Sequence, residues 1–279
     1  MLIFGSELNA IYKIPGLKKS LNKEAIFEYF NYGYIPSPYS IQEGINQLRP
    51  GNYIEIPQQI VENKFNRLPK SISWWDPYKE SLSKSDLKKE PYMIDELERL
   101  LIESITLQSK SEVPICTFLS GGIDSTLIAT LYQKINTNKI NTFTISFPNE
   151  MKNNNNFNEG CYANKISNYL NTNHQEIALT SKDAINIIPN ISNIYSEPFS
   201  DSSQIPTFLI CKKAKLSGFK VALTGDGGDE LFGGYNRHFI LPKIHQYGKN
   251  FSDKSLNFAS RFLDLLIKNE CLLTNEKKQ

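Results

Sequence analysis

Two glycine-rich segments carry the residue types best suited to chemistry. Residues 120–125 read Ser-Gly-Gly-Ile-Asp-Ser, and residues 225–230 read Gly-Asp-Gly-Gly-Asp-Glu. Each follows a short apolar run and precedes a pattern of helical spacing, which predicts a turn from a strand into a helix. Glycines let the backbone approach a ligand closely, and free amides at the start of a helix bind anions. Each segment is therefore a candidate phosphate-binding loop.

Acidic residues in both loops narrow the kind of anion that could bind. The carboxylates of Asp124, Asp226 and Asp229 would repel a phosphate unless a hard cation such as Mg²⁺ lay between them. We therefore interpret the two loops as a site for a polyphosphate with magnesium, hence for ATP and Mg²⁺. A turn without a ligand is the alternative for each loop, although the three acidic residues among the three glycines of residues 225–230 suit a buried turn poorly.

Two common nucleotide motifs do not fit these loops. The chain contains no Gly-x-x-x-x-Gly-Lys-Ser/Thr segment, which excludes a Walker A loop. The second loop is not a dinucleotide fingerprint, because Glu230 stands where the third glycine would be.

Composition bounds the class of protein. The 279 residues are 40% hydrophobic and 22% charged, enough for one large core or two unequal domains. A net charge of +2 gives no broad attraction to nucleic acid or anionic lipid, and no apolar run reaches the roughly 18 residues of a membrane span. Nucleic acid and membrane are therefore not the expected partners. The cysteines are too scattered for a zinc site or a disulfide framework, which favours a reducing, cytoplasmic setting: Cys116, Cys161, Cys211 and Cys271.

The elements that must position the loops follow from hydrophobic patterning. We expect strands at 113–119, 140–147, 174–179 and 219–223. The helices expected around them cover 93–105, 127–131, 162–170, 184–194 and 207–216, with a further helical pattern at 256–266. Strands that alternate with helices predict an α/β fold, a doubly wound parallel sheet whose ligands lie at the carboxyl ends of the strands.

The chain also divides by composition. Residues 1–65 are dense in aromatic residues and turn signals, and a helix is expected to begin near Ser20. Residues 66–91 are polar and proline-punctuated, which is typical of a linker. Residues 92–279 contain both loops and form the predicted ATP-binding domain.

Both loops resemble those of a known family. The first is similar to the pyrophosphate loop of the N-type ATP pyrophosphatases. Residues 224–235, Thr-Gly-Asp-Gly-Gly-Asp-Glu-Leu-Phe-Gly-Gly-Tyr, resemble the signature of the glutamine-dependent asparagine synthetases. Residues 4–10, Phe-Gly-Ser-Glu-Leu-Asn-Ala, look like the closing part of their glutaminase domain. The resemblance covers nearly the whole chain and implies the pyrophosphate-loop ATPase fold, preceded by a small α+β remnant of an N-terminal nucleophile glutaminase domain.

The resemblance also implies residue roles. ATP would be bound by backbone or side-chain groups of Phe118, Leu119, Ser120, Gly121, Gly122, Asp124, Ser125, Ile145, Thr224 and Gly225. Asp124 and Asp229 would hold Mg²⁺, and Asp226 would act on ammonia as a base or electrostatic partner. The reaction implied is the activation of the aspartate side-chain carboxylate as an acyl-adenylate, which ammonia from glutamine converts to asparagine. A homodimer is an expected assembly.

Departures from the family pattern leave alternatives open. Residue 2 is Leu2, where the family carries a nucleophilic cysteine, so we expect a fragment without glutaminase activity that is also shortened at its C-terminus. Residues 197–204 differ from the family, which leaves open a relative that amidates another carboxylate, such as a sugar acid in surface polysaccharide synthesis, or a β-lactam-forming cyclase. An inactive nucleotide-binding fragment is the third reading. Glu197 and Asp201 could either line the acceptor site or cap a helix.

Overall fold

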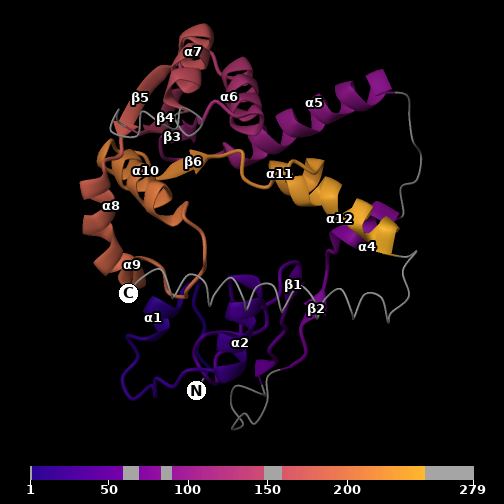
Figure 1. Cartoon of the computed structure of the whole chain (residues 1–279), viewed down its shortest axis with the longest axis vertical. Helices are drawn as coiled ribbons and strands as arrows, with labels where there is room; N and C mark the ends of the chain where they lie inside the picture. The colour runs from indigo at the N-terminus through magenta and orange to yellow at the C-terminus, as the bar shows by residue number, and fades with distance from the viewer. Residues whose placement is uncertain (1, 59–68, 83–89, 148–158, 249–279) are drawn as a thin grey trace, which may run out of the picture. The chain divides into compact units, whose positions relative to one another are not determined.

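The computed structural model describes residues 2–58, 69–82, 90–147 and 159–248 (Figure 1). These residues fall into two compact units that divide between Thr224 and Gly225. The helical pattern expected at 256–266 and Cys271 lie outside the described residues.

The first unit contains a four-stranded parallel sheet. Its strands are β3 (Ile115–Phe118), β4 (Asn141–Ser146), β5 (Asn173–Ala178) and β6 (Val221–Leu223), in the order β5-β4-β3-β6. All three pairings are parallel, and β3 lies between β4 and β6. The four strands expected between residues 113 and 223 are all present, and the predicted α/β class is confirmed.

Helices cover both faces of this sheet (Figure 1). On one face, α5 (Glu90–Gln108), α6 (Ile123–Ile135) and α7 (Gly160–Leu170) pack around Leu119, which is 1% exposed. On the other, α10 (Gln204–Leu216) packs against Phe143. Parallel strands need a helical crossover between them, so the alternating sequence pattern leads directly to these layers.

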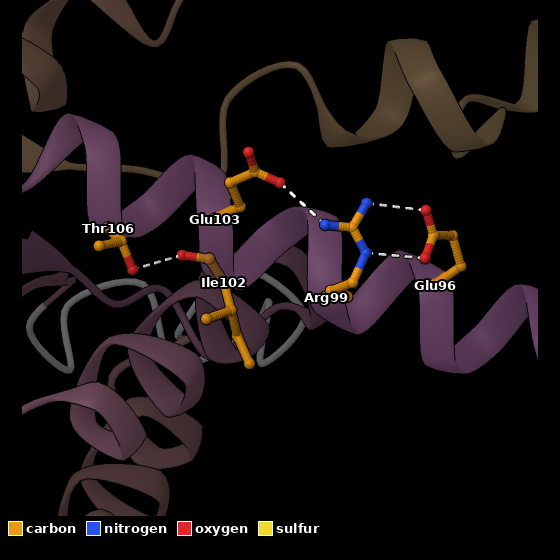
Figure 2. Close-up of polar contacts among 5 residues, drawn as sticks. All are labelled: Glu96, Arg99, Ile102, Glu103 and Thr106. Carbon is orange, nitrogen blue, oxygen red and sulfur yellow. Dashed lines mark hydrogen bonds and ion pairs between the residues drawn. The ribbon is translucent and has the colours of Figure 1, made fainter.

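Helix α5 illustrates how one helix serves two environments. Its inner side contributes Ile105 to the core, whereas its outer side carries an ion-pair ladder (Figure 2). The Arg99 guanidinium binds Glu96 through two hydrogen bonds of 2.8 Å and Glu103 through one of 3.0 Å. Such exposed pairs at three- and four-residue spacing add only about 0.3–0.5 kcal/mol each, so the apolar side determines where this helix packs.

The helix expected at 184–194 is divided into three pieces, so the prediction of one continuous helix is wrong. The structure has α8 (Ser181–Ile187), the 3₁₀ turn η3 (Ile188–Asn190) and α9 (Ile191–Ile194). Pro189 cannot donate an amide hydrogen bond and disturbs the preceding turn, which explains the interruption. The first piece begins earlier than expected, because Thr180 and Asp183 form a reciprocal capping box.

The N-terminal region is built from short elements. They are α1 (Leu8–Ile11), α2 (Lys23–Tyr32), the antiparallel pair β1 (Asn52–Tyr53) and β2 (Ile72–Ser73), and α4 (Pro77–Leu82). The second helix starts after Asn22, whose side chain accepts hydrogen bonds from two backbone amides, and not after Ser20. Asn22 is the stronger cap because its side-chain oxygen meets the free amides of the first turn.

The second unit begins with the second glycine-rich loop. Two helices are described in it, the five-residue α11 (Gly228–Phe232) and α12 (Asn236–Gly248), which contains Pro242. Among the described helices of the chain, none has the length and apolar composition needed to cross a membrane.

The three described cysteines should differ sharply in reactivity. Cys116 on β3 is fully buried, its thiol donates to the Val221 carbonyl, and burial raises the pKa of this thiol to about 11. Cys161 and Cys211 are exposed. Because only thiolates are alkylated, iodoacetamide at pH 8 should modify Cys161 and Cys211 at least about 100-fold faster than Cys116, as measured by peptide mass spectrometry. Comparable rates in the folded protein would contradict the burial of Cys116, and the difference should vanish in urea.

Candidate nucleotide-binding site

The sheet brings the starting points of both loops to one edge. Strand β3 pairs in parallel with β6, with Thr117 opposite Leu223. The chain therefore leaves β3 at Leu119 and β6 at Thr224 from the same, carboxyl edge of the sheet. In open α/β sheets this edge is where ligands bind.

Hydroxyl groups fix the shape of the first loop. Ser125 is only 8% exposed as a residue. Its hydroxyl accepts a hydrogen bond from the Ser120 amide at 3.1 Å and lies 2.8 Å from the Ser120 hydroxyl. The Ser120 hydroxyl in turn accepts from the Gly122 amide at 3.2 Å. The predicted loop residues are thus brought together, and the two serines hold the turn in place from within.

Gly121 is the position in this loop that tolerates no side chain. Its φ of +88° lies in the left-handed region. A Cβ atom there would lie 2.7 Å from Cβ of Tyr162 and 3.0 Å from the amide nitrogen of Ala163, both in the first turn of α7. Sequence reasoning missed this packing of α7 against the loop, because nothing local to residues 160–163 signals it.

The loop runs into a helix that is open at its N-terminus. Helix α6 begins after Gly122, and no side chain caps it. The first amides of a helix have no partner within the helix, so together with the helix dipole they form an anion site beside residues 120–122. Asp124 is half-buried in this first turn, and among the described residues no side-chain hydrogen bond or ion pair to its carboxylate is recorded.

The donors available suit magnesium held jointly with phosphate. Across the described ranges, no group of three or more His, Cys, Asp or Glu side chains could hold a metal ion. Magnesium usually takes one or two carboxylates and completes its shell with water and phosphate oxygens. A carboxylate such as that of Asp124 fits this role without a preformed metal cage.

The three apolar residues predicted at the site divide between the sheet faces. Phe118 and Ile145 pack on the α10 face near the carboxyl ends of β3 and β4. Leu119 is buried on the opposite face, so only its backbone is available to a ligand. Phe118 also lines a cavity of about 680 Å³ whose other walls come mainly from α10, the α10–β6 turn and the start of β6. No residue of 120–125 lines this cavity, so Phe118 is the only one of the residues 118–125 that it shares with the candidate site.

The second loop is a tight turn in its own right. Gly227 has φ of +90° and precedes α11, and the Gly228 amide donates to the Gly225 carbonyl at 3.2 Å. Asp226 is exposed on this turn, whereas Asp229 is half-buried in the first turn of α11.

Gly234 leaves room for the Asp229 carboxylate. A Cβ atom at Gly234 would overlap Oδ1 of Asp229, and the Gly234 amide donates to the Asp229 carbonyl at 3.0 Å. Close by, the Tyr235 hydroxyl donates to Glu230 at 2.9 Å, which raises the pKa of Tyr235. The glycines of this segment therefore serve the orientation of an acidic side chain as well as the turn.

His174 and Asp201 both have structural partners. Nδ1 of His174 lies 2.8 Å from the Thr142 hydroxyl, and burial lowers the pKa of His174. The Asp201 carboxylate accepts from the Ser203 amide at 2.8 Å, which is a local turn contact. Glu197 instead reaches the N-terminal region, as described below.

Family models and known proteins match the sequence of this chain. The model of the protein family described as asparagine synthase matches residues 96–278. The model of the family described as glutamine amidotransferase domain matches residues 1–66. A Methanocaldococcus jannaschii protein with the name asparagine synthetase (glutamine-hydrolyzing) 2 is 33% identical over 241 residues, which are 85% of this chain and 43% of that protein. Asparagine synthetase (glutamine-hydrolyzing) 1 of Bacillus subtilis is 26% identical over 77% of this chain and 31% of its own length.

A relative with a different name also matches. Amidase chry2 of Gibberella zeae is 26% identical over 70% of this chain and 29% of its own length. The chain thus spans less than half the length of each of these relatives. Because the asparagine synthase match covers well over half of the chain, in a parallel α/β fold, the chain belongs to the asparagine synthase family.

Proposed function

We propose that this chain is the ATP-binding part of a glutamine-dependent, amide-forming ligase that acts in the cytoplasm. The observation that carries the proposal is the pairing of β3 with β6, which starts both glycine-rich loops from one edge of the sheet. In the proposal the amides and hydroxyls of residues 120–125 hold the departing pyrophosphate, and Phe118, Ile145 and Thr224 lie beside the nucleoside.

The carboxylates take separate roles in the proposed reaction. Asp124 and Asp229 would each supply a carboxylate to Mg²⁺, which when bound would neutralise the charge on the phosphate oxygens. Asp226 stands beside the activated acid and receives a proton from the attacking ammonia, or stabilises its positive charge. Adenylation gives the acid a good leaving group, so ammonia attacks the acyl carbon, AMP leaves, and an amide forms. Aspartate is the proposed acceptor, with asparagine as the product.

A second acceptor is a specific alternative. A relative named as an amidase lies within the matches, and residues 197–204 are the segment in which we expect a departure from the asparagine synthetase pattern. The alternative is an enzyme that amidates another carboxylate, such as a sugar acid.

The test is ATP–pyrophosphate exchange by the chain extended to the length of its relatives. We expect labelled pyrophosphate to enter ATP only when both Mg²⁺ and aspartate are present. If exchange required a different acid and did not occur with aspartate, that acid would be the acceptor in place of aspartate. ATP binding without exchange for any acid would contradict the ligase proposal and favour a nucleotide-binding protein.

A further inference from the structure

Glu197 lies at the centre of a polar junction within the first unit. It precedes α10, in the segment 195–203 that follows α9. Its carboxylate accepts three hydrogen bonds, from the Ser40 hydroxyl at 2.9 Å, the Ile41 amide at 2.7 Å and the Gln47 side-chain amide at 2.6 Å. All three donors come from the N-terminal region, about 150 residues away in sequence.

The same segment is bound by the N-terminal region on both sides of Glu197. The Asn9 amide donates to the Ser196 hydroxyl at 3.4 Å. The Ser200 amide donates to the Gly33 carbonyl at 2.6 Å. The Tyr29 hydroxyl lies 3.0 Å from the Ser200 hydroxyl. Three separate stretches of the N-terminal region therefore converge on one short segment.

The environment makes the carboxylate hard to replace. Ser40 is 1% exposed and Glu197 is half-buried, so water offers only a limited substitute for the lost acceptor. Hydrogen bonds to an ionised acceptor are also stronger than those between neutral groups. Burial and the nearby Glu197 charge raise the pKa of Tyr12, a second sign that this carboxylate faces the N-terminal region.

The segment is also tied to the helix that follows it. The Tyr195 hydroxyl donates to the Gln204 carbonyl at 2.6 Å, and the Gln204 side chain donates to the Asp201 carbonyl at 2.9 Å. The rings of Tyr195 and Phe199 meet edge to face, with centroids 5.0 Å apart. Helix α10 then packs on the sheet face that carries Phe118 and Ile145. A continuous series of contacts thus links the N-terminal region to that face.

We propose that Glu197 is a positioning residue that couples residues 8–47 to the segment 195–203, so that the placement of this segment depends on the N-terminal region. Its functional meaning rests on the proposed function, in which the N-terminal part belongs to the domain that supplies ammonia and the rest of the chain uses it. The physical coupling itself involves neither ATP nor an acceptor acid.

Amide hydrogen exchange of the whole chain tests the coupling. In Glu197→Gln the side-chain carbonyl can still accept, so exchange of the Ile41 amide should increase less than in Glu197→Ala. In Glu197→Ala the Ile41 amide should exchange at least about tenfold faster, because its acceptor is lost. The Ser200 amide should accelerate by a similar factor, although its own acceptor, the Gly33 carbonyl, is untouched. The Leu119 amide, which bonds Phe143 in the sheet, should keep its protection and thereby show that the sheet is folded. Asp201→Asn, which alters a carboxylate of the same segment with only a local contact, should change neither Ile41 nor Ser200.

Faster exchange at Ile41 with unchanged exchange at Ser200 would overturn the proposal, since it would reduce Glu197 to a local acceptor. Unchanged exchange at both amides would also overturn it. If the Glu197 variants lose protection at Leu119, their sheet is no longer folded, and Gln47→Ala becomes the test of the coupling. This substitution removes one hydrogen-bond donor to Glu197 and keeps the carboxylate. It should accelerate Ser200 exchange by a smaller factor, and no change there would refute the coupling. Since exchange is followed without ATP, failure here is distinct from failure in the pyrophosphate assay.

Discussion

Alanine at position 121 is expected to abolish measurable ATP binding and to lower the free energy of unfolding by at least about 2 kcal/mol. Two effects combine at this position. The left-handed φ of Gly121 strains any other residue, and the new Cβ would lie 2.7 Å from Tyr162 and 3.0 Å from the backbone of Ala163. Neither neighbour is the end of a flexible side chain. The loop or the start of α7 must therefore move, and the amides at the N-terminus of α6 would lose their alignment with the phosphates.

The neighbouring glycine provides a matched control. Gly122 has φ of −70°, which any residue adopts, and a Cβ there would meet the Ser120 hydroxyl at 3.3 Å as its nearest neighbour. Gly122→Ala should cost about 1 kcal/mol and keep ATP binding within about tenfold of the parent chain. Isothermal titration calorimetry and urea unfolding measure both quantities. Equal effects of the two substitutions would show that the packing of α7 on the loop is unimportant.

The contrast between these glycines also shows how far sequence reasoning reaches. The motif at 120–125 predicts a turn from strand to helix, because an apolar run, two glycines and a helical pattern are all local features. The same motif says nothing of which glycine is indispensable. That depends on Tyr162 and Ala163, which approach only after β4 and α7 have packed on β3 and α6.

Glu197 makes the same point for side chains. An acidic residue before a helix is read from sequence as a cap or as a ligand for a substrate, because both roles depend on nearby residues. Its observed donors, Ser40, Ile41 and Gln47, come from a distant part of the chain. The break of the helix at Pro189, by contrast, is a local effect, and the ordinary rule for proline inside a helix would have predicted it.

Removing the Asp124 carboxylate should abolish the advantage that Mg²⁺ gives to ATP binding. Under the proposed function, the parent chain should bind ATP more tightly with Mg²⁺ than with EDTA, because the metal would offset the repulsion between the carboxylates and the phosphates. Asp124→Asn should weaken binding of the magnesium complex by about 100-fold. It should leave binding of metal-free ATP unchanged or make it tighter, since a negative charge beside the phosphates has been removed. A loss of ATP affinity that appears only when Mg²⁺ is present is the signature of a metal ligand.

Asp183→Asn is the matched comparison for this experiment, because it also removes a carboxylate from the first turn of a helix. Asp183 caps α8 together with Thr180, and the Thr180 hydroxyl and amide hold the pKa of Asp183 below its usual value. This substitution should lower stability and leave the ratio of the two ATP dissociation constants as it is in the parent chain. If the effect came from lost charge or lost stability in general, the ratio of the two ATP dissociation constants would change in both variants. If Asp124 is a metal ligand, the ratio should change in Asp124→Asn alone. If Asp124→Asn weakened ATP binding equally with Mg²⁺ and with EDTA, the Asp124 carboxylate would stabilise the conformation of the loop and would not bind the metal. Other groups would then have to hold Mg²⁺.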